Sequence, residues 1–434
     1  MGGQQMDTIE TMTKIDSGAF DEAFGYLYSE KAQEQRARYK NAALQFETLF
    51  GAGREIRLFS APGRTEVGGN HTDHQHGRVL AAGVNLDVIA VASKNDDRII
   101  RIKSEGFPMD VVDLSDLSAR DDERNTAAAL IRGVAARLAA MGHPVAGFDA
   151  YTTSNVLKGS GLSSSAAFET IVGTMLGSLY ADGSVDAVQI AQIGQYAENV
   201  YFGKPSGLMD QMACSVGGFI TIDFADPEKP VVEKVDFDFA RSGYKLCIVD
   251  TGGNHADLTD DYASAAVEMC SVARALGKEV LRDIAPETFY GRVASLRGKC
   301  TDRALLRAFH FYSDNARVPR QVAALRAGDF ETFKALVIES GRSSFMYLQN
   351  VYTCKNPDEQ GLSLALAMSE HLLAGRGAWR VHGGGFAGTI QSFVPDDLLE
   401  AYRERMESVF GAGSCHVLSI RPVGGVEITP KLGA

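Results

Sequence analysis

Residues 158–166 read K-G-S-G-L-S-S-S-A and carry the clearest chemical signal of the chain. Glycines let a backbone approach a ligand closely, and the free N–H groups at a helix start favour a phosphate. The serine hydroxyls can bind an oxygen or Mg²⁺. The loop matches neither a Walker A motif nor a Rossmann fingerprint. Taken alone, it is explained as well by a flexible surface turn as by a phosphate site.

A second segment, residues 61–74, gathers Arg64, Asn70, His71 and Asp73 into a stretch rich in glycine. Carboxylate, amide and imidazole groups exchange hydrogen bonds with hydroxyls, so this segment could recognise a polyol. The histidines and the aspartate could instead bind a metal, although no matching ligand cluster occurs elsewhere in the sequence. A solvated loop is the third interpretation.

Two shorter segments also combine glycine with groups that could do chemistry. Asp210 follows a turn at residues 203–207 in an apolar setting, where an aspartate is either a helix cap or a site carboxylate. Residues 383–385 are three consecutive glycines, which imply close approach to a ligand or to another element. A plain turn between strands accounts for these glycines equally well.

The elements that must position these segments mix helices and strands without regular alternation, which predicts an α+β fold. Residues 61–77 are expected to form a glycine-rich turn. Alternating patterns predict strands at residues 56–60, 84–91, 99–103, 148–153, 219–224 and 245–249. Apolar spacing of three and four residues predicts helices at residues 127–141, 166–180, 185–200 and 396–410.

The chain is expected to divide into three parts. Residues 1–50 are an N-terminal leader and helix, of which the first 16 residues are predicted to be frayed. Residues 51–230 form a first lobe and residues 231–434 a second, since proline and charged residues interrupt the apolar pattern around residues 225–243.

Composition excludes several classes of function. The 434 residues include 43 basic and 55 acidic side chains, and the net charge of -12 disfavours nucleic acid and anionic membranes as partners. The 6 cysteines form no C-x-x-C motif, which indicates free thiols in a reducing compartment. The sequence shows neither a signal peptide nor an apolar run long enough to span a bilayer. We therefore expect a cytoplasmic protein that acts on small molecules.

The four segments, taken in order, resemble the motifs of the GHMP small-molecule kinases and, within them, of the galactokinases. G-L-S-S-S-A occurs unchanged at residues 161–166, and P-x-G-x-M-D-Q is intact at residues 205–211. The family motif G-R-x-N-x-I-G-E-H-T-D-Y corresponds to residues 63–74, and G-G-G-F-G-G to residues 383–388 with one change. The resemblance spans about residues 50–430.

This resemblance implies a two-lobed GHMP kinase fold, with ATP and a sugar in the cleft between the lobes. It implies a monomer that uses ATP and Mg²⁺ to phosphorylate the anomeric C1 hydroxyl of D-galactose. Asp210 falls on the position of the candidate base, with Arg64 beside it. The implied sugar-contacting residues are Asn70, His71, Asp73, Gly207 and Tyr262. The implied phosphate-loop residues are Gly159, Ser160, Gly161, Leu162, Ser163, Ser164 and Ser165, and the implied metal ligands are Ser165 and Glu198.

The sequence departs from the family motifs at several positions. Asn70 replaces a glutamate and Glu66 replaces an asparagine in the first motif. His382 stands where a small hydroxyl residue is common, and Ala387 replaces a glycine. The aromatic residue of the family's adenine side, expected near Ala127, is missing.

These departures leave two alternatives to a galactose kinase. Loss of a carboxylate at Asn70, near the sugar C6, would reduce repulsion of a uronic acid and would suit a D-galacturonate kinase, whereas the retained Tyr262 favours galactose. The second alternative is a non-catalytic sensor that binds sugar and ATP. The intact S-S-S-A segment, together with Arg64 and Asp210, argues against a sensor.

Overall fold

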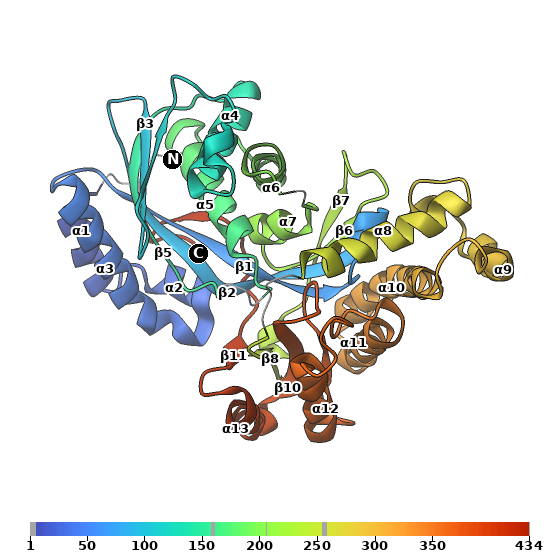
Figure 1. Cartoon of the computed structure of the whole chain (residues 1–434). Coiled ribbons are helices and arrows are strands. Elements are labelled where there is room, and N and C mark those ends of the chain that lie inside the picture. The colour runs from blue at the N-terminus through green and yellow to red at the C-terminus, as the bar shows by residue number, and fades with distance from the viewer. Residues whose placement is uncertain (1–5, 158–160, 205, 254–257, 434) are drawn as a thin grey trace.

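The computed structural model describes residues 6–157, 161–204, 206–253 and 258–433, and it contains two sheets (Figure 1). The larger sheet has 8 strands in the order β12-β1-β2-β5-β3-β4, with β6 and β7 added beside β2. Its strands are β1 (Arg57–Gly68), β2 (Arg78–Lys94), β3 (Ile99–Ser104), β4 (Met109–Asp113), β5 (Phe148–Ser154), β6 (Phe219–Asp223), β7 (Val231–Val235) and β12 (Val426–Ile428).

The smaller sheet has 4 antiparallel strands in the order β11-β8-β10-β9. Its strands are β8 (Tyr244–Asp250), β9 (Ala378–Val381), β10 (Thr389–Pro395) and β11 (Cys415–Leu418). The helices of this half are α8 (Thr259–Ala275), α9 (Pro286–Leu296), α10 (Asp302–Arg326), α11 (Phe330–Ser343), α12 (Gly361–Leu373) and α13 (Leu399–Phe410). Helices α11, α12 and α13 lie beside the smaller sheet, whereas α8 and α9 lie beside α10, farther from it (Figure 1).

Strand β2 shows why the larger sheet carries helices on both faces. Val88 and Ala90 lie in one buried core and Ile89 and Val91 in another, because successive side chains of a strand point to opposite faces. The helices over the first face are α4 (Ala127–Ala140), α5 (Ser164–Tyr180), α6 (Ala187–Tyr196) and α7 (Met209–Val216). Those over the second face are α1 (Thr8–Asp16), α2 (Asp21–Tyr28) and α3 (Ala32–Phe50).

Residues 8–16, which we expected to be part of a frayed leader, form helix α1 instead. The Asp7 carboxylate caps this helix by accepting a hydrogen bond from the Glu10 backbone N–H at 2.8 Å. Ile15 is fully buried, in a core to which α3 and the sheet also contribute. The prediction was wrong because the partners of Ile15 lie far away in the sequence.

Strand β1 continues through residues 61–68, where we expected a glycine-rich turn. Its pairing with β2 shifts register between Pro62 and Arg64 and again between Glu66 and Gly68. Such bulges accommodate proline and re-aim the side chains that follow them. Gly63 is needed because a Cβ there would lie 2.8 Å from the carbonyl oxygen of Leu162. The strand therefore runs directly against the glycine–serine loop.

The sheets do not divide at residue 230, where we placed the lobe boundary. Strand β7 begins at Val231 yet pairs with β6 of the larger sheet, and β12 returns to pair with β1. All 6 cysteines are free thiols, of which Cys214, Cys247 and Cys415 are buried, Cys270 and Cys300 are half-buried and Cys354 is exposed. Among the described residues, no helix has the length and apolar character that crossing a membrane requires.

Candidate active site

Arg64 on β1 and Asp210 in the first turn of α7 form the central ion pair of the site. The Arg64 Nε and Nη2 atoms each lie 2.8 Å from Asp210 Oδ1. Arg64 is buried and also donates to the Gly161 carbonyl oxygen, whereas the Asp210 side chain keeps 33% of its surface exposed. The buried Arg64 guanidinium thus holds a carboxylate that remains accessible to solvent.

Asp210 is held in its charged form. Burial raises its pKa, but the charge of Arg64 and hydrogen bonds from Arg64 and Ser163, with the nearby charge of Lys204, outweigh burial and bring the pKa below its ordinary value. The Ser163 hydroxyl donates to Asp210 Oδ2 at 2.6 Å. Both carboxylate oxygens are therefore oriented by fixed donors.

The glycine–serine loop leads directly into helix α5. Gly161 and Ser163 adopt left-handed backbone conformations, with φ of 71° and 59°. Ser163 occupies the N-cap of α5, but its side chain does not cap the helix because it is bonded to Asp210. The first N–H groups of α5 are therefore free of a side-chain cap from Ser163, which suits a phosphate. Gly159 and Ser160, two of the predicted phosphate-loop residues, lie outside the described residues.

Ser165 and Glu198, the residues expected to hold a metal, are adjacent. The Ser165 hydroxyl lies 3.3 Å from Glu198 Oε1, and Glu198 comes from the π-helical turn η4 (Ala197–Phe202). Lys204 Nζ lies 2.9 Å from the same oxygen. Gln211 Nε2 donates to Glu198 Oε2 at 2.8 Å and to Glu169 Oε2 at 3.0 Å, so this amide fixes two carboxylates.

His71 presents an unused acceptor. Its Nε2 donates to the Gly384 carbonyl oxygen at 3.0 Å, which leaves Nδ1 as the lone-pair nitrogen. This Nδ1 is buried and has no hydrogen-bond partner within the described part of the chain. Burial, together with the neighbouring charge of His74, lowers the pKa of His71 to about 4, so the ring is neutral near pH 7.

Asp73 and Gly207, two of the predicted sugar-contacting residues, lie against one another. A Cβ on Gly207 would lie 2.6 Å from Asp73 Oδ2. Only glycine at this position leaves the carboxylate where it is. The Asp73 Oδ1 atom accepts the backbone N–H of His74 at 2.9 Å, which fixes the other oxygen toward the loop before α7.

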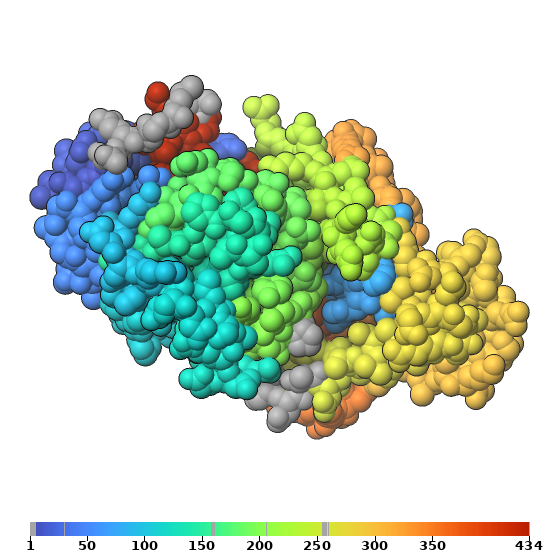
Figure 2. All heavy atoms as spheres, turned by 90° about the horizontal axis from the view of Figure 1, so that it is seen from above, coloured from blue at the N-terminus to red at the C-terminus, as the bar shows by residue number. Residues whose placement is uncertain are grey.

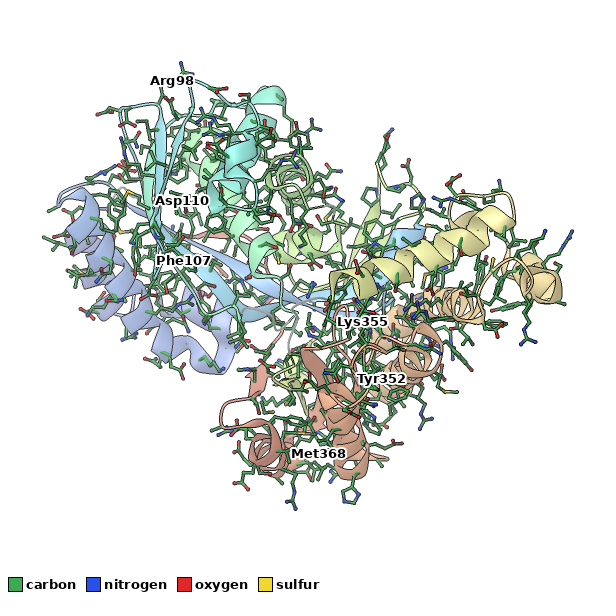
Figure 3. The ribbon with its side chains drawn as sticks, viewed as in Figure 1. Arg98, Phe107, Asp110, Tyr352, Lys355 and Met368 are labelled. Atoms are coloured by element: carbon green, nitrogen blue, oxygen red, sulfur yellow. The ribbon has the colours of Figure 1, made fainter. Side chains whose placement is uncertain are left out.

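Tyr262 on α8 contacts the glycine turn at residues 383–388. Its hydroxyl donates to the Gly385 carbonyl oxygen at 3.0 Å, and its ring packs edge-on against Phe386. Near the start of α8, Asp261 precedes Tyr262, and its Oδ2 lies 3.3 Å from Lys355 Nζ (Figure 3). The glycine turn thus fixes both the hydroxyl and the ring of Tyr262.

Asn70, by contrast, directs its polar atoms to protein groups. Its Nδ2 donates to Glu66 Oε1 at 2.9 Å and to the Gly383 carbonyl oxygen at 2.7 Å. Its Oδ1 accepts from Ser344 at 3.2 Å and from Asn350 at 2.9 Å. The side chain is fully buried, so in this arrangement none of its hydrogen-bonding capacity is left for a sugar.

Several residues that support the site were not predicted. Arg380 is fully buried and pairs with Glu66 at 2.8 Å, and His382 bridges Thr65 at 3.1 Å and Thr389 at 3.0 Å beneath the loop. Lys204 was not predicted as a site residue either. A charged residue predicted inside a core strand is the signal that could have identified Arg380, since such a charge needs a partner.

The surface is hollowed where these residues meet. Figure 2 shows a depression between the green part of the chain that includes α7 and the yellow part that includes α8, with blue residues of the N-terminal strands at its floor. Arg64 lies on β1, Asp210 on α7 and Tyr262 on α8, and His71 follows β1 and contacts Gly384. The structure therefore gathers most of the predicted site residues around one cleft.

Comparison with known proteins identifies the family. Residues 129–218 match the family described as GHMP kinases N terminal domain, and residues 44–94 match the galactokinase galactose-binding signature. The galactokinase of Streptomyces coelicolor is 32% identical over 395 residues, which cover 90% of this chain and 96% of that protein. The galactokinase of Glaesserella parasuis is 30% identical over 368 residues, which cover 83% and 90%.

Solved structures agree with the sequence matches. The Lactococcus lactis galactokinase complexed with galactose has a TM-score of 0.77 and 25% identity, over 90% of this chain and 100% of that chain. The Methanococcus jannaschii mevalonate kinase has a TM-score of 0.60 at 13% identity, over 85% and 98%, which shows a shared fold alone. The predicted α+β GHMP kinase fold is confirmed, and the chain belongs to the galactokinase family of the GHMP kinases.

Proposed function

We propose that this chain transfers the γ-phosphoryl group of ATP to the anomeric C1 hydroxyl of D-galactose and releases galactose 1-phosphate and ADP. The observation that carries the proposal is the Asp210 carboxylate, which is held by hydrogen bonds from Arg64 and from Ser163, the N-cap of α5. The chain is also similar to galactokinases over most of its length.

In this reaction the C1 oxygen forms a bond to the γ-phosphorus while the bond from that phosphorus to the β–γ bridging oxygen breaks. The electron pair of the broken bond stays on the ADP oxygen, and the proton of the C1 hydroxyl passes to Asp210. Because the transition state of phosphoryl transfer is loose, the hydroxyl needs alignment more than early deprotonation. A carboxylate with a lowered pKa suits that role, since it accepts the hydroxyl's hydrogen bond and takes up the proton late.

Arg64 keeps Asp210 ionised. The N–H groups at the start of α5 and the hydroxyl of Ser164 would hold the phosphates, while the Ser163 hydroxyl donates to Asp210. The side chains on the sugar side would be His71, through its free Nδ1 acceptor, with Asp73 and Tyr262. Gly207 would leave room for the Asp73 carboxylate.

Ser165 and Glu198 fit a Mg²⁺ ion that arrives with ATP. They offer a hydroxyl and a carboxylate oxygen 3.3 Å apart, and the described residues include no group of 3 or more His, Cys, Asp or Glu able to hold a metal alone. Mg²⁺ is commonly held by one or two carboxylates together with substrate phosphates. Bound there, Mg²⁺ would neutralise charge on the phosphate oxygens.

Nothing in the site favours the two alternatives. The galacturonate interpretation required the position of Asn70 to face the sugar, but its side chain is bonded to Glu66 and to the glycine turn. A sensor would need a damaged phosphate segment, whereas Ser163 and Asp210 are hydrogen bonded to each other.

ADP release from MgATP tests the proposal, across D-galactose, D-galacturonate, N-acetylgalactosamine, L-arabinose and D-glucose. We expect turnover with galactose well above turnover with the other sugars, and its loss in the Asp210→Asn variant. Turnover confined to galacturonate would show that galacturonate, not galactose, is the substrate. Absence of turnover with every sugar would reject the kinase activity.

A further inference from the structure

Lys204 lies beside Glu198, one of the two proposed metal ligands. It follows η4 and precedes α7, and its backbone N–H donates to the Glu198 carbonyl oxygen at 3.1 Å. The side chain is 59% exposed, so only its ammonium end is held, by Glu198. A four-carbon stem in solvent can carry the charge to another position without disturbing the fold.

The ammonium contacts an oxygen that the proposed metal would also need. Glu198 Oε1 accepts from Lys204 Nζ at 2.9 Å and from Ser165 Oγ at 3.3 Å. The other oxygen of Glu198 is held by Gln211 at 2.8 Å. A divalent ion bound to Ser165 and Glu198 would lie beside the ammonium and repel it, so the two cations compete for one carboxylate.

The negative charge around Glu198 favours a cation that can move. Three carboxylates converge on Gln211 and its neighbours: Glu169, Glu198 and Asp210. Glu169 is buried, and both its burial and the charge of Glu198 raise its pKa well above the ordinary value. Arg64 is committed to Asp210, so Lys204 is the cation paired with Glu198 in the described structure. A divalent ion bound there would leave the Lys204 ammonium free to bind a phosphate oxygen of the nucleotide.

Building on the proposed kinase activity, we propose that Lys204 is an exchangeable counterion of the nucleotide site. Its ammonium neutralises Glu198 before MgATP binds, then moves from that carboxylate to a phosphate oxygen of the bound nucleotide. The exchange keeps Glu198 from binding free metal strongly, and it supplies a cation to the phosphates. No covalent bond changes in this step.

Binding of Mn²⁺ to the nucleotide-free full chain, followed by electron paramagnetic resonance, tests the first half. The Lys204→Met variant is expected to bind Mn²⁺ about fivefold more tightly than the unmodified chain, since one half-exposed competing charge is gone. Lys204→Arg should bind Mn²⁺ like the unmodified chain. Lys40→Met is the matched control, because Lys40 pairs with Asp16 at 2.6 Å on the N-terminal helices, away from α7 (Figure 1).

Steady-state kinetics test the second half. In Lys204→Met, kcat/KM for MgATP should fall about tenfold, as expected for the loss of one charge-assisted hydrogen bond to phosphate, while the KM for galactose is unchanged. Lys204→Arg should recover most of the loss. Lys40→Met should leave both parameters unchanged.

Both effects are required. Unchanged Mn²⁺ affinity in Lys204→Met overturns the counterion role, and an unchanged kcat/KM for MgATP overturns the transfer to phosphate, so either result rejects the proposal. If the unmodified chain fails to phosphorylate any sugar, the proposed function fails by that result. The Mn²⁺ measurement then still decides whether Lys204 competes for Glu198, because it needs no turnover.

Discussion

The amide of Asn70 donates to the carboxylate of Glu66 at 2.9 Å, so two positions at which the sequence departs from the first kinase motif are in direct contact. The motif places asparagine at the first of these positions and glutamate at the second, and this chain carries the reverse. Arg380 contacts the Glu66 carboxylate at 2.8 Å. The two departures therefore preserve one amide and one carboxylate in a buried pair.

An exchange of the pair should be tolerated better than either single change. Asn70→Glu brings a second carboxylate against buried Glu66 and should lower the free energy of unfolding by about 3 kcal/mol. In the double variant Glu66→Asn/Asn70→Glu, the loss of unfolding free energy should be about 2 kcal/mol smaller than the sum of the two single losses. Urea denaturation of the two single variants and the double variant measures this coupling. Additive losses would show that the two positions act independently.

Removal of the Asp210 charge should abolish turnover without abolishing binding. Asp210→Asn is expected to lower kcat at least about 100-fold, because the C1 hydroxyl loses its acceptor. Ser163→Ala, which removes only one donor to that carboxylate, should cost about tenfold. Initial rates with galactose, together with galactose binding by calorimetry, separate the two effects. An equal loss in both variants would contradict the assignment of Asp210.

The acid limb of the pH profile should depend on Arg64. Burial raises the pKa of Asp210 and Arg64 lowers it, so without the guanidinium the pKa rises. In Arg64→Met the residual kcat/KM should therefore begin to fall at a higher pH than in the unmodified chain. Arg64→Lys retains the charge and should shift the limb less. An acid limb that stays in place in Arg64→Met would show that Asp210 does not set it.

Stability should fall in acid because of His71. Its pKa is about 4 in the folded chain and near 6.5 in the unfolded chain, so below pH 6.5 the unfolded chain binds a proton that the folded chain refuses. The free energy of unfolding should drop by about 1.4 kcal/mol per pH unit from pH 6.5 toward pH 4 on account of this residue. His71→Asn should flatten that slope, and His143→Asn, at a half-buried position outside the site, should not. An unaltered slope in His71→Asn would contradict the buried neutral ring.

Deletion of residues 1–50 should prevent stable folding. These residues cover Ile89 and Val91 of the sheet, and Tyr28 donates to the buried Asp87 at 2.6 Å. The shortened chain should be insoluble or should bind a hydrophobic dye strongly, because it exposes this apolar face. Soluble yield and dye fluorescence measure the effect. A soluble shortened chain with full activity would show that the N-terminal helices serve a partner instead.

The sequence by itself determined the chemistry and the family. The G-L-S-S-S-A loop, Asp210 and the glycine turn were recognisable because backbone freedom and hydroxyl placement depend on residues within a few positions of one another. The main helices and strands were predictable for a similar reason, since the apolar periodicity of α5 or β5 is local. The match to galactokinases confirms the predicted family.

Only the tertiary structure decided which groups meet. Asn70 donates to Gly383, 313 residues away, so its burial in a cross-lobe network could not be read from the neighbours of Asn70 in the sequence. Lys204 resembled an ordinary surface lysine until Glu198 was placed beside it. Helix α1 depends on distant residues for the burial of Ile15, and β1 absorbs Pro62 through a bulge against β2. Each case depends on long-range packing, which a local pattern does not encode.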